Sequence, residues 1–320
     1  MVVTALVCAG SGCNKSGKLN SSSTFTPPTG PVELKLKWTM GERVVQELDM
    51  KQTMNLNLPG RPEPTKQNTT MGQKYALTVM NQDATGGHEL ELEFLSARMN
   101  TEMGGKTMIN YDSAKRSPAD TNNPVAGMFD KIIGCKIRYF LDASNNVVRL
   151  EGVDALVDRL SSGRQDPMVA PLKSMFNEGY FKQMLSSSRF LPPKPVQQGD
   201  SWPVGFEMPL GSIGTMTMNY NITFQSWEMH GKRNCVRLEF QGQLKSKPDS
   251  APDQGGMKIS IQDGATSGIS WFDPELGIII DTTMDQDMTM VMALPGSASQ
   301  PITMTNQLNQ RLDIKLDSVD

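Results

Sequence analysis

Histidine and cysteine are scarce in this sequence, which has only 2 His and 4 Cys among 320 residues. Zinc sites usually draw on closely spaced Cys and His, and serine or cysteine hydrolases need a histidine beside the nucleophile. His88 and His230 both lie in polar turns that contain glycine, and no Gly-x-Ser-x-Gly motif is present. We therefore expect two solvated turn histidines and no enzyme: no catalytic residue, no metal site and no cofactor.

An excess of positive charge and a long apolar run are also missing. Lys and Arg number 31, Asp and Glu number 34, and the net charge is -3. Binding to the nucleic-acid backbone needs clustered Lys and Arg, and a membrane-spanning helix needs roughly 18 to 20 apolar residues. We therefore expect no nucleic-acid partner and no such helix. The 38% of hydrophobic and 20% of charged residues instead indicate a globular protein with a core.

The N-terminus combines a short apolar stretch with a cysteine. Residues 2–9 read VVTALVCA, three small residues follow, and Cys13 precedes a polar stretch. This order resembles a bacterial lipoprotein signal, although no Lys or Arg precedes the apolar stretch and Gly10 stands where Leu is usual. The resemblance implies a signal-like segment at residues 1–12 and lipidation of Cys13. A secreted chain without the anchor and a terminus with incidental cysteines remain the alternatives.

The stretch that follows has little to bury. Residues 13–30 are rich in Ser, Thr, Gly, Pro and Lys, a composition typical of a flexible or extended tether. With an acylated Cys13, it predicts a folded body that a lipid anchor holds at a membrane of the bacterial cell envelope, on the periplasmic side. Asn14 after the cysteine is similar to the outer-membrane sorting seen in some bacteria.

The sequence contains a loose internal repeat. Residues 75–94 and residues 220–240 each have an alternating run, a polar turn with Gly and His, and a second alternating run that ends in Leu-Glu-Phe. This pattern predicts a β-hairpin in each half of the chain. A further hairpin is expected after each of them, beginning at Gly134 and at Gly268. The repeat therefore predicts a duplicated β architecture.

Between the two halves the apolar spacing changes to that of a helix. Val153 and Leu156 begin such a stripe, and a proline-rich stretch ends the segment. We predict a short helical connector at residues 153–195 between a first β lobe at 31–152 and a second at 196–320. The expected fold class is mainly β (α+β): two duplicated antiparallel lobes joined by helices that pack on one sheet or close it as a lid.

The join between the connector and the second lobe reads FLPPKPVQQGDSW, residues 190–202. With the lipoprotein-like start, the two lobes and the helices, it resembles a family of bacterial envelope lipoproteins with a domain of unknown function. The resemblance covers nearly the whole mature chain and implies an envelope location, and it brings no catalytic residues. At the level of the fold, sheets with helices on the concave side are similar to the lipoprotein carriers of the periplasm.

Methionine, in contrast, is abundant, with 23 residues. Met216 and Met218 share one face of a predicted strand, and Met288, Met290 and Met292 share one face of another. Methionine fills irregular cores and lines adaptable apolar grooves, and its thioether is a soft ligand that suits Cu(I). Core packing, a groove for a lipid or peptide, and copper binding are thus the three interpretations. We take these five residues as the candidate ligand-binding set.

The cysteines of the body are Cys135 and Cys235. Alternation places Cys135 on the same face as Ile137, which is expected to point inward, and Cys235 on the same face as Arg237, which is expected to point outward. An oxidising envelope would permit a disulfide between them, whereas the opposite facing of the two side chains argues against it.

These features together predict a lipid-anchored, non-enzymatic protein of the envelope. Its partners would be the membrane, through the anchor, and an apolar ligand or another envelope component held in a concavity of the sheet. A structural or interaction lipoprotein with no small ligand is the alternative, and Met-based copper binding is the third.

Overall fold

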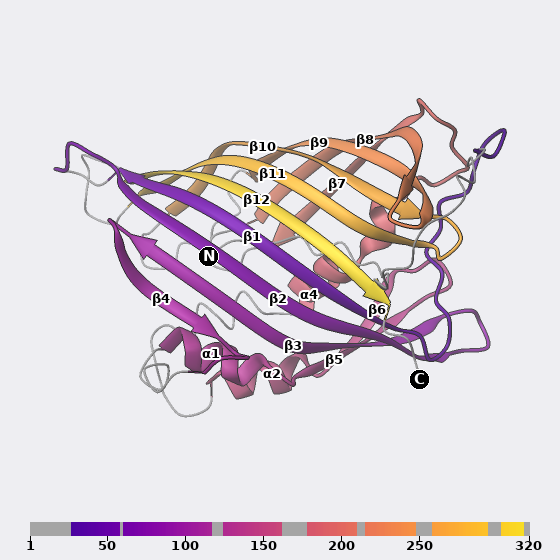
Figure 1. The fold of residues 1–320 in the computed structure, drawn as a ribbon, viewed down its shortest axis with the longest axis horizontal. Coiled ribbons are helices and arrows are strands. Elements are labelled where there is room, and N and C mark those ends of the chain that lie inside the picture. The colour runs from indigo at the N-terminus through magenta and orange to yellow at the C-terminus, as the bar shows by residue number, and fades with distance from the viewer. Residues whose placement is uncertain are drawn as a thin grey trace, which may run out of the picture.

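The computed structural model describes residues 27–57, 60–116, 124–161, 178–209, 215–247, 258–293 and 302–316. Within these ranges, 12 strands form one sheet, whose paired neighbours are antiparallel (Figure 1). The order is β6-β5-β3-β2-β1-β12-β11-β10-β9-β8-β7, and β4 pairs with β3. The prediction of a mainly β protein is therefore confirmed.

The strands are β1 (Arg43–Asn57), β2 (Thr65–Gln82), β3 (His88–Met103), β4 (Lys106–Asp112), β5 (Lys136–Leu141), β6 (Val147–Glu151), β7 (Ser201–Pro209), β8 (Thr215–His230), β9 (Arg233–Ser246), β10 (Lys258–Asp273), β11 (Ile278–Ala293) and β12 (Ile302–Leu316). The helices are α1 (Pro124–Ile132), α2 (Val153–Ser161), α4 (Glu178–Leu185) and the short 3-10 helix η2 (Ser187–Phe190).

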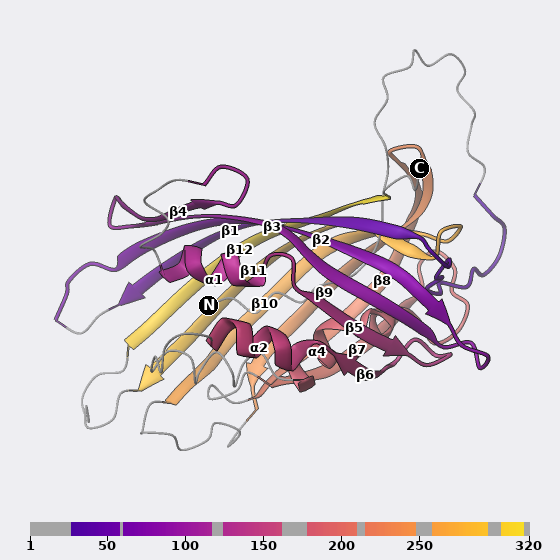
Figure 2. The same ribbon diagram turned by 90° about the horizontal axis from the view of Figure 1, so that it is seen from below.

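Alternation along the strands separates the two faces of the sheet. In β8, Met218, Tyr220 and Ile222 are buried, whereas Asn219 and Asn221 between them are exposed. We call the face with the buried side chains the inner face. The helices lie beneath this face, and the sheet curves around them (Figure 2). Apolar side chains of strands and helices therefore meet there in one large core cluster and a second, smaller cluster.

The hairpins expected from the repeat are confirmed. β2 pairs with β3 in the first half, and β8 pairs with β9 in the second. The following pairs, β5 with β6 and β10 with β11, are also antiparallel hairpins.

The division into two lobes, in contrast, is not confirmed. β1 pairs with β12 along almost its whole length, from Val44 opposite Leu316 to Asn57 opposite Thr303. This seam joins the first half of the chain to its last strand, so the two halves share one sheet. Alternation predicts that a strand exists and which face it buries, but it carries no information about a partner more than 200 residues away.

Two helices fall within the segment predicted as a connector. α2 and α4 lie inside residues 153–195, and residues 162–177 between them are outside the described ranges. α4 packs against both β6 and β7, the two edge strands of the sheet. These helices thus cover the inner face, and a connector between separate lobes is not confirmed.

α1 is a helix that the sequence interpretation did not anticipate. Phe129 on α1 stacks on Tyr111 of β4 at a ring-centroid distance of 5.4 Å, and the Tyr111 hydroxyl donates to Asp130 at 2.7 Å. α1 therefore covers the inner face of β2, β3 and β4, together with buried Ala97. No helix within the described ranges is long and apolar enough to cross a membrane.

An extended segment before β1 runs along the turns at one end of the sheet; we call residues 32–41 the strap. Val32 bridges to Val196, the Lys37 amide donates to the Gly277 carbonyl at 3.1 Å, and the Trp38 indole donates to Asn145 at 2.7 Å. Leu34 and Leu36 of the strap are buried in the core. The strap therefore contacts turns from both halves of the chain and links them at one end of the sheet.

Candidate functional site

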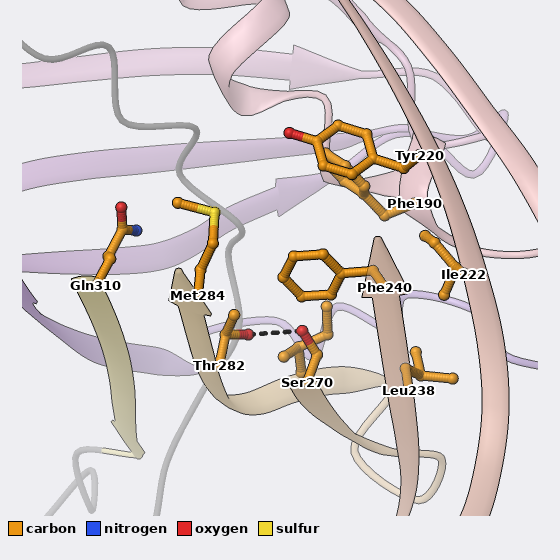
Figure 3. A pocket seen from close by; sticks show the side chains of 10 residues that line it. Phe190, Tyr220, Ile222, Leu238, Phe240, Ser270, Thr282, Met284 and Gln310 are labelled. Carbon is orange, nitrogen blue, oxygen red and sulfur yellow. Dashed lines mark hydrogen bonds between the residues drawn. The ribbon is translucent and has the colours of Figure 1, made fainter. Parts of the chain in front are cut away.

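A cavity opens on the inner face between η2 and strands β8 to β12 (Figure 3). Its volume is about 50 Å³, which is room for three or four water-sized groups. Its wall is mostly apolar. The lining side chains are those of Phe190, Tyr220, Ile222, Leu238, Phe240, Ser270, Ile279, Thr282, Met284 and Gln310.

Glycines opposite aromatic residues create the hollow. Tyr220 of β8 pairs with Gly242 of β9, and Phe240 of β9 pairs with Gly268 of β10. A β-carbon added at Gly242 would clash with the Tyr220 ring, and one added at Gly268 would clash with the Phe240 ring. Each ring therefore lies down over a glycine of the next strand instead of standing upright, and the space above the sheet stays open.

Phe190 forms the edge of the cavity nearest the helices. Its ring meets Phe206 at 5.7 Å and Tyr220 at 5.9 Å, both edge to face. The Trp202 indole donates to the Phe190 carbonyl at 3.1 Å and so holds η2 against β7. Edge-to-face pairs of this kind add to the stabilisation from burial. The position of Phe190 therefore depends on an aromatic cluster that β7 and β8 provide.

Besides the Tyr220 hydroxyl, three polar side chains interrupt the apolar wall. The hydroxyl groups of Ser270 and Thr282 are 2.9 Å apart and share a hydrogen bond (Figure 3). Within the described part of the chain, Oε1 of Gln310 is buried without a hydrogen-bond partner. These three groups are uncharged, so the cavity is a neutral site with a small polar region at β10, β11 and β12.

Electrostatics keep the site neutral. Burial raises the pKa of Tyr220 well above its ordinary value of 10.0, so the phenol stays protonated. Arg189 precedes Phe190 in the chain, and its guanidinium lies 4.5 Å from the centre of the Phe206 ring. Burial lowers the pKa of Arg189 to about 10, and the group remains charged at neutral pH.

The structure places four of the candidate methionines, Met216, Met218, Met288 and Met290, on the inner face, and none of these four lines the cavity. Met216 and Met218 are buried in the core, and Met288 and Met290 pack against it. The side chain of Met292 lies outside the described ones. These positions agree with core packing, the first of the three interpretations of the methionines. Ligand binding by these five residues remains a prediction.

Met284, which is in register with the other methionines of β11, does line the cavity. The sequence interpretation did not select the aromatic residues Phe190, Tyr220 and Phe240 or the amide of Gln310. An aromatic residue opposite a glycine on the next strand could have indicated the cavity. That pairing, however, can be recognised only when the register between the strands is known.

Other residues considered from the sequence lie apart from the cavity. Cys13 and the rest of residues 1–26 are outside the described ranges. His230 is not a solvated turn residue: it contacts Asp281 at 3.1 Å and stacks on Trp271 at 4.3 Å. In His88, Nδ1 is buried without a partner within the described chain.

Cys135 and Cys235 are both free and buried. The expectation that Cys235 points outward is therefore wrong, because its side chain is fully buried within the core cluster and its thiol donates to the Arg233 carbonyl. Among the described residues, no group of three or more His, Cys, Asp or Glu is arranged to hold a metal ion.

The fold and the cavity thus define a class of protein: a single curved antiparallel sheet with helices and a small neutral pocket on its inner face. The model of a family of unknown function (DUF6263) matches residues 85–279, more than half of the chain. The chain belongs to this family. No curated protein matches the sequence.

Solved structures resemble the chain only distantly. Lipovitellin, in a structure of its lipid–protein interactions, has 10% identity and a TM-score of 0.43, covering 88% of this chain and 26% of that chain. A Bacteroides fragilis protein with a YmcC-like fold, assigned as exported, has 9% identity and a TM-score of 0.30, with 90% and 100% coverage. An outer-membrane channel of Pseudomonas putida has 8% identity and a TM-score of 0.20, with 90% and 100% coverage. The chain spans about a quarter of the lipovitellin chain. With all three TM-scores below 0.5, no argument rests on these likenesses.

Proposed function

We propose that this chain is a lipid-anchored, non-enzymatic protein of the bacterial cell envelope that binds the apolar part of a small ligand. The binding site is the cavity between η2 and β8 to β12. The observation that carries the proposal is the construction of this cavity: glycines beneath two aromatic rings keep a hollow open on the inner face. The anchor rests on the resemblance of residues 1–13 to a lipoprotein signal.

The chemistry of the wall supports an apolar ligand. Seven of its side chains are aromatic, aliphatic or thioether groups, as in most small-molecule sites; they are Phe190, Tyr220, Ile222, Leu238, Phe240, Ile279 and Met284. Met284 has three rotatable bonds and adapts to a ligand without strain. Burial of a methylene group here would stabilise the complex by about 0.8 kcal/mol.

The size of the cavity favours a second candidate. Sites for drug-sized ligands have volumes of roughly 300 to 1,000 Å³, whereas this cavity measures about 50 Å³. As it stands, it accepts only a small group or the end of a chain, and a larger ligand has to displace Phe190. A purely structural or interaction lipoprotein is therefore the alternative.

Native mass spectrometry of the full chain, incubated with an envelope lipid extract, distinguishes the two candidates. We expect a stoichiometric adduct on the wild-type protein. Met284→Trp fills the cavity and should remove the adduct. Asp287→Trp, on the exposed outer face of the same strand, is the matched control and should keep it. A clean apoprotein mass for the wild type would support the structural alternative and contradict ligand binding.

A further inference from the structure

The polar region of the cavity carries information about the head group of the ligand. Gln310, Ser270 and Thr282 line the cavity and are 5%, 5% and 6% exposed, respectively. Buried polar groups are normally hydrogen-bonded, because leaving one unpaired costs about 1–3 kcal/mol. An unpaired polar group at this position therefore either lowers the stability of the protein without a benefit or forms part of a binding site.

Gln310 offers an acceptor that the described chain does not use. Its Oε1 is buried and has no hydrogen-bond partner there. Gln310 stands opposite Met284 in the β11–β12 pairing, and both side chains line the cavity (Figure 3). A ligand that reaches Met284 is thus beside an unsatisfied amide oxygen, which requires a hydrogen-bond donor.

Ser270 and Thr282 supply the complementary group. Two hydroxyls have two protons, and the hydrogen bond between them at 2.9 Å uses one. The second proton remains available to an acceptor on a ligand. The site therefore presents an acceptor at β12 and a donor at the β10–β11 pair, a combination that fits a hydroxyl or an amide group.

A charged head group is disfavoured. None of the residues that line the cavity is charged at neutral pH, and an ion taken into such a wall loses its hydration without gaining a partner. The rings of Phe190, Tyr220 and Phe240 lie on the side of the cavity away from Gln310, and the neutral Tyr220 hydroxyl is turned toward the side of Met284 and Gln310 (Figure 3).

From this geometry we infer that the cavity selects a neutral amphiphile: a molecule with a hydroxyl or amide head that bonds to Gln310 and the Ser270–Thr282 pair, and an apolar tail against Phe240 and Tyr220. This inference rests on the proposed function and assigns its ligand class.

Three probes with the same six-carbon chain test the inference: 1-hexanol, hexane and hexanoate. Each is larger than the cavity of about 50 Å³, so its binding requires Phe190 to move. Binding to the full chain is followed by the methyl resonance of Met284 in protein with ¹³C-methyl methionine, assigned with Met284→Leu. We expect 1-hexanol to bind at least about tenfold more tightly than hexanoate, because the cavity offers the carboxylate no cation.

The variant Gln310→Leu removes the acceptor and keeps the bulk. It should shift the affinity ratio of 1-hexanol to hexane about tenfold towards hexane, the size expected from one hydrogen bond. Gln307→Leu, on the exposed outer face of β12, should leave the ratio unchanged. If Gln310→Leu does not fold, the double variant Ser270→Ala with Thr282→Val should lower the same ratio.

The outcomes separate the two proposals. Equal ratios in wild type and both cavity variants, with clear binding of hexane, would overturn the head-group assignment and leave the proposed function standing. Tighter binding of hexanoate than of 1-hexanol would also overturn it. If no probe moves the Met284 resonance at any concentration, both the ligand class and the proposed function are wrong.

Discussion

At the scale of single residues, glycine decides where the inner face is hollow. Phe240 and Tyr220 belong to strands that bury every second side chain, and a residue with a β-carbon at the paired position would push each ring upright into the cavity. Gly242 and Gly268 have no positive φ, so backbone conformation does not require them. Their role is the space that they leave for the rings.

Gly268→Ala tests this role. The new β-carbon would clash with the Thr283 carbonyl oxygen and the Phe240 ring. We expect a loss of about 1–3 kcal/mol in the free energy of unfolding, typical of overpacking, and weaker binding of 1-hexanol as Phe240 tilts into the cavity. Gly127→Ala in α1 is the matched control, because within the described ranges no atom beyond its chain neighbours and the backbone of its own helix lies within 4 Å of the added β-carbon. The control should be neutral or stabilising by up to about 1 kcal/mol.

Cys235 predicts a specific dependence of stability on pH. Burial, with a smaller effect of Asp273, raises the pKa of its thiol from 9.0 to about 12. Above pH 9 the thiol of the unfolded chain ionises while that of the folded protein stays protonated. Stability from this group is therefore complete below pH 9 and falls by up to about 1.4 kcal/mol per pH unit between pH 9 and 12.

Urea unfolding between pH 7 and 10.5 measures this dependence. The wild type should lose stability above pH 9 more steeply than Cys235→Ala, which lacks the thiol but retains Tyr220. Identical pH profiles of the two proteins would mean that the thiol of Cys235 is not protected by burial.

At the scale of elements, the strap and η2 cover parts of the inner face that the strands by themselves leave exposed. η2 places Phe190 on the cavity, and the strap places Leu34 and Leu36 in the core. Neither element has the length or the periodicity from which helices and strands are predicted in a sequence. Their positions depend on contacts with distant turns, such as the hydrogen bond from Trp38 to Asn145.

Leu34→Ala tests whether the strap is an integral part of the fold. Leu34 is 1% exposed, and truncation of a fully buried leucine costs about 2–5 kcal/mol because a cavity remains. Lys35→Ala, at the neighbouring exposed position, should change the free energy of unfolding by less than about 0.5 kcal/mol. Thermal unfolding of the two variants measures the difference; an equal effect would mean that the strap is only loosely attached.

At the scale of the whole molecule, the β1–β12 seam makes the two halves of the chain one folding unit. Both halves contribute to a single buried cluster, which includes Leu48 and Leu92 from the first and Phe224 and Leu238 from the second. The internal repeat therefore describes the order of strands along the chain, and it does not mark a boundary between independent bodies.

This continuity predicts one cooperative unfolding transition. Scanning calorimetry of the full chain should give a single peak whose calorimetric and van't Hoff enthalpies agree. Two separate peaks, each attributable to one half by hydrogen exchange, would instead support the two lobes expected from the repeat.

The proposed anchor is also a property of the whole molecule. In a bacterial host that acylates lipoproteins, Cys13→Ser should move the protein from the membrane fraction to the soluble envelope fraction, because the acyl chains supply the membrane affinity. Cys8→Ser is the matched control and should remain in the membrane fraction. A wild-type protein that is already soluble in the envelope would refute the lipid anchor.

The sequence by itself determined the class of fold, the hairpins of both halves and the face to which Met216, Met218, Met288 and Met290 belong. These features are local, since strand alternation and turn residues act within a few residues of each other. The residues of the cavity were not determined in this way: Phe190 and Gln310 are 120 positions apart and meet only after β8 to β12 have paired.

The tertiary structure alone decided that the halves share one sheet, that the strap crosses its end, and that a cavity stays open beside Met284. The physical reason is the same in each case. Backbone hydrogen bonds between strands are nearly independent of side-chain identity. From its sequence alone, a strand such as β12 could therefore pair with many other strands. The packing of the whole inner face, including the glycines beneath Tyr220 and Phe240, selects one of them.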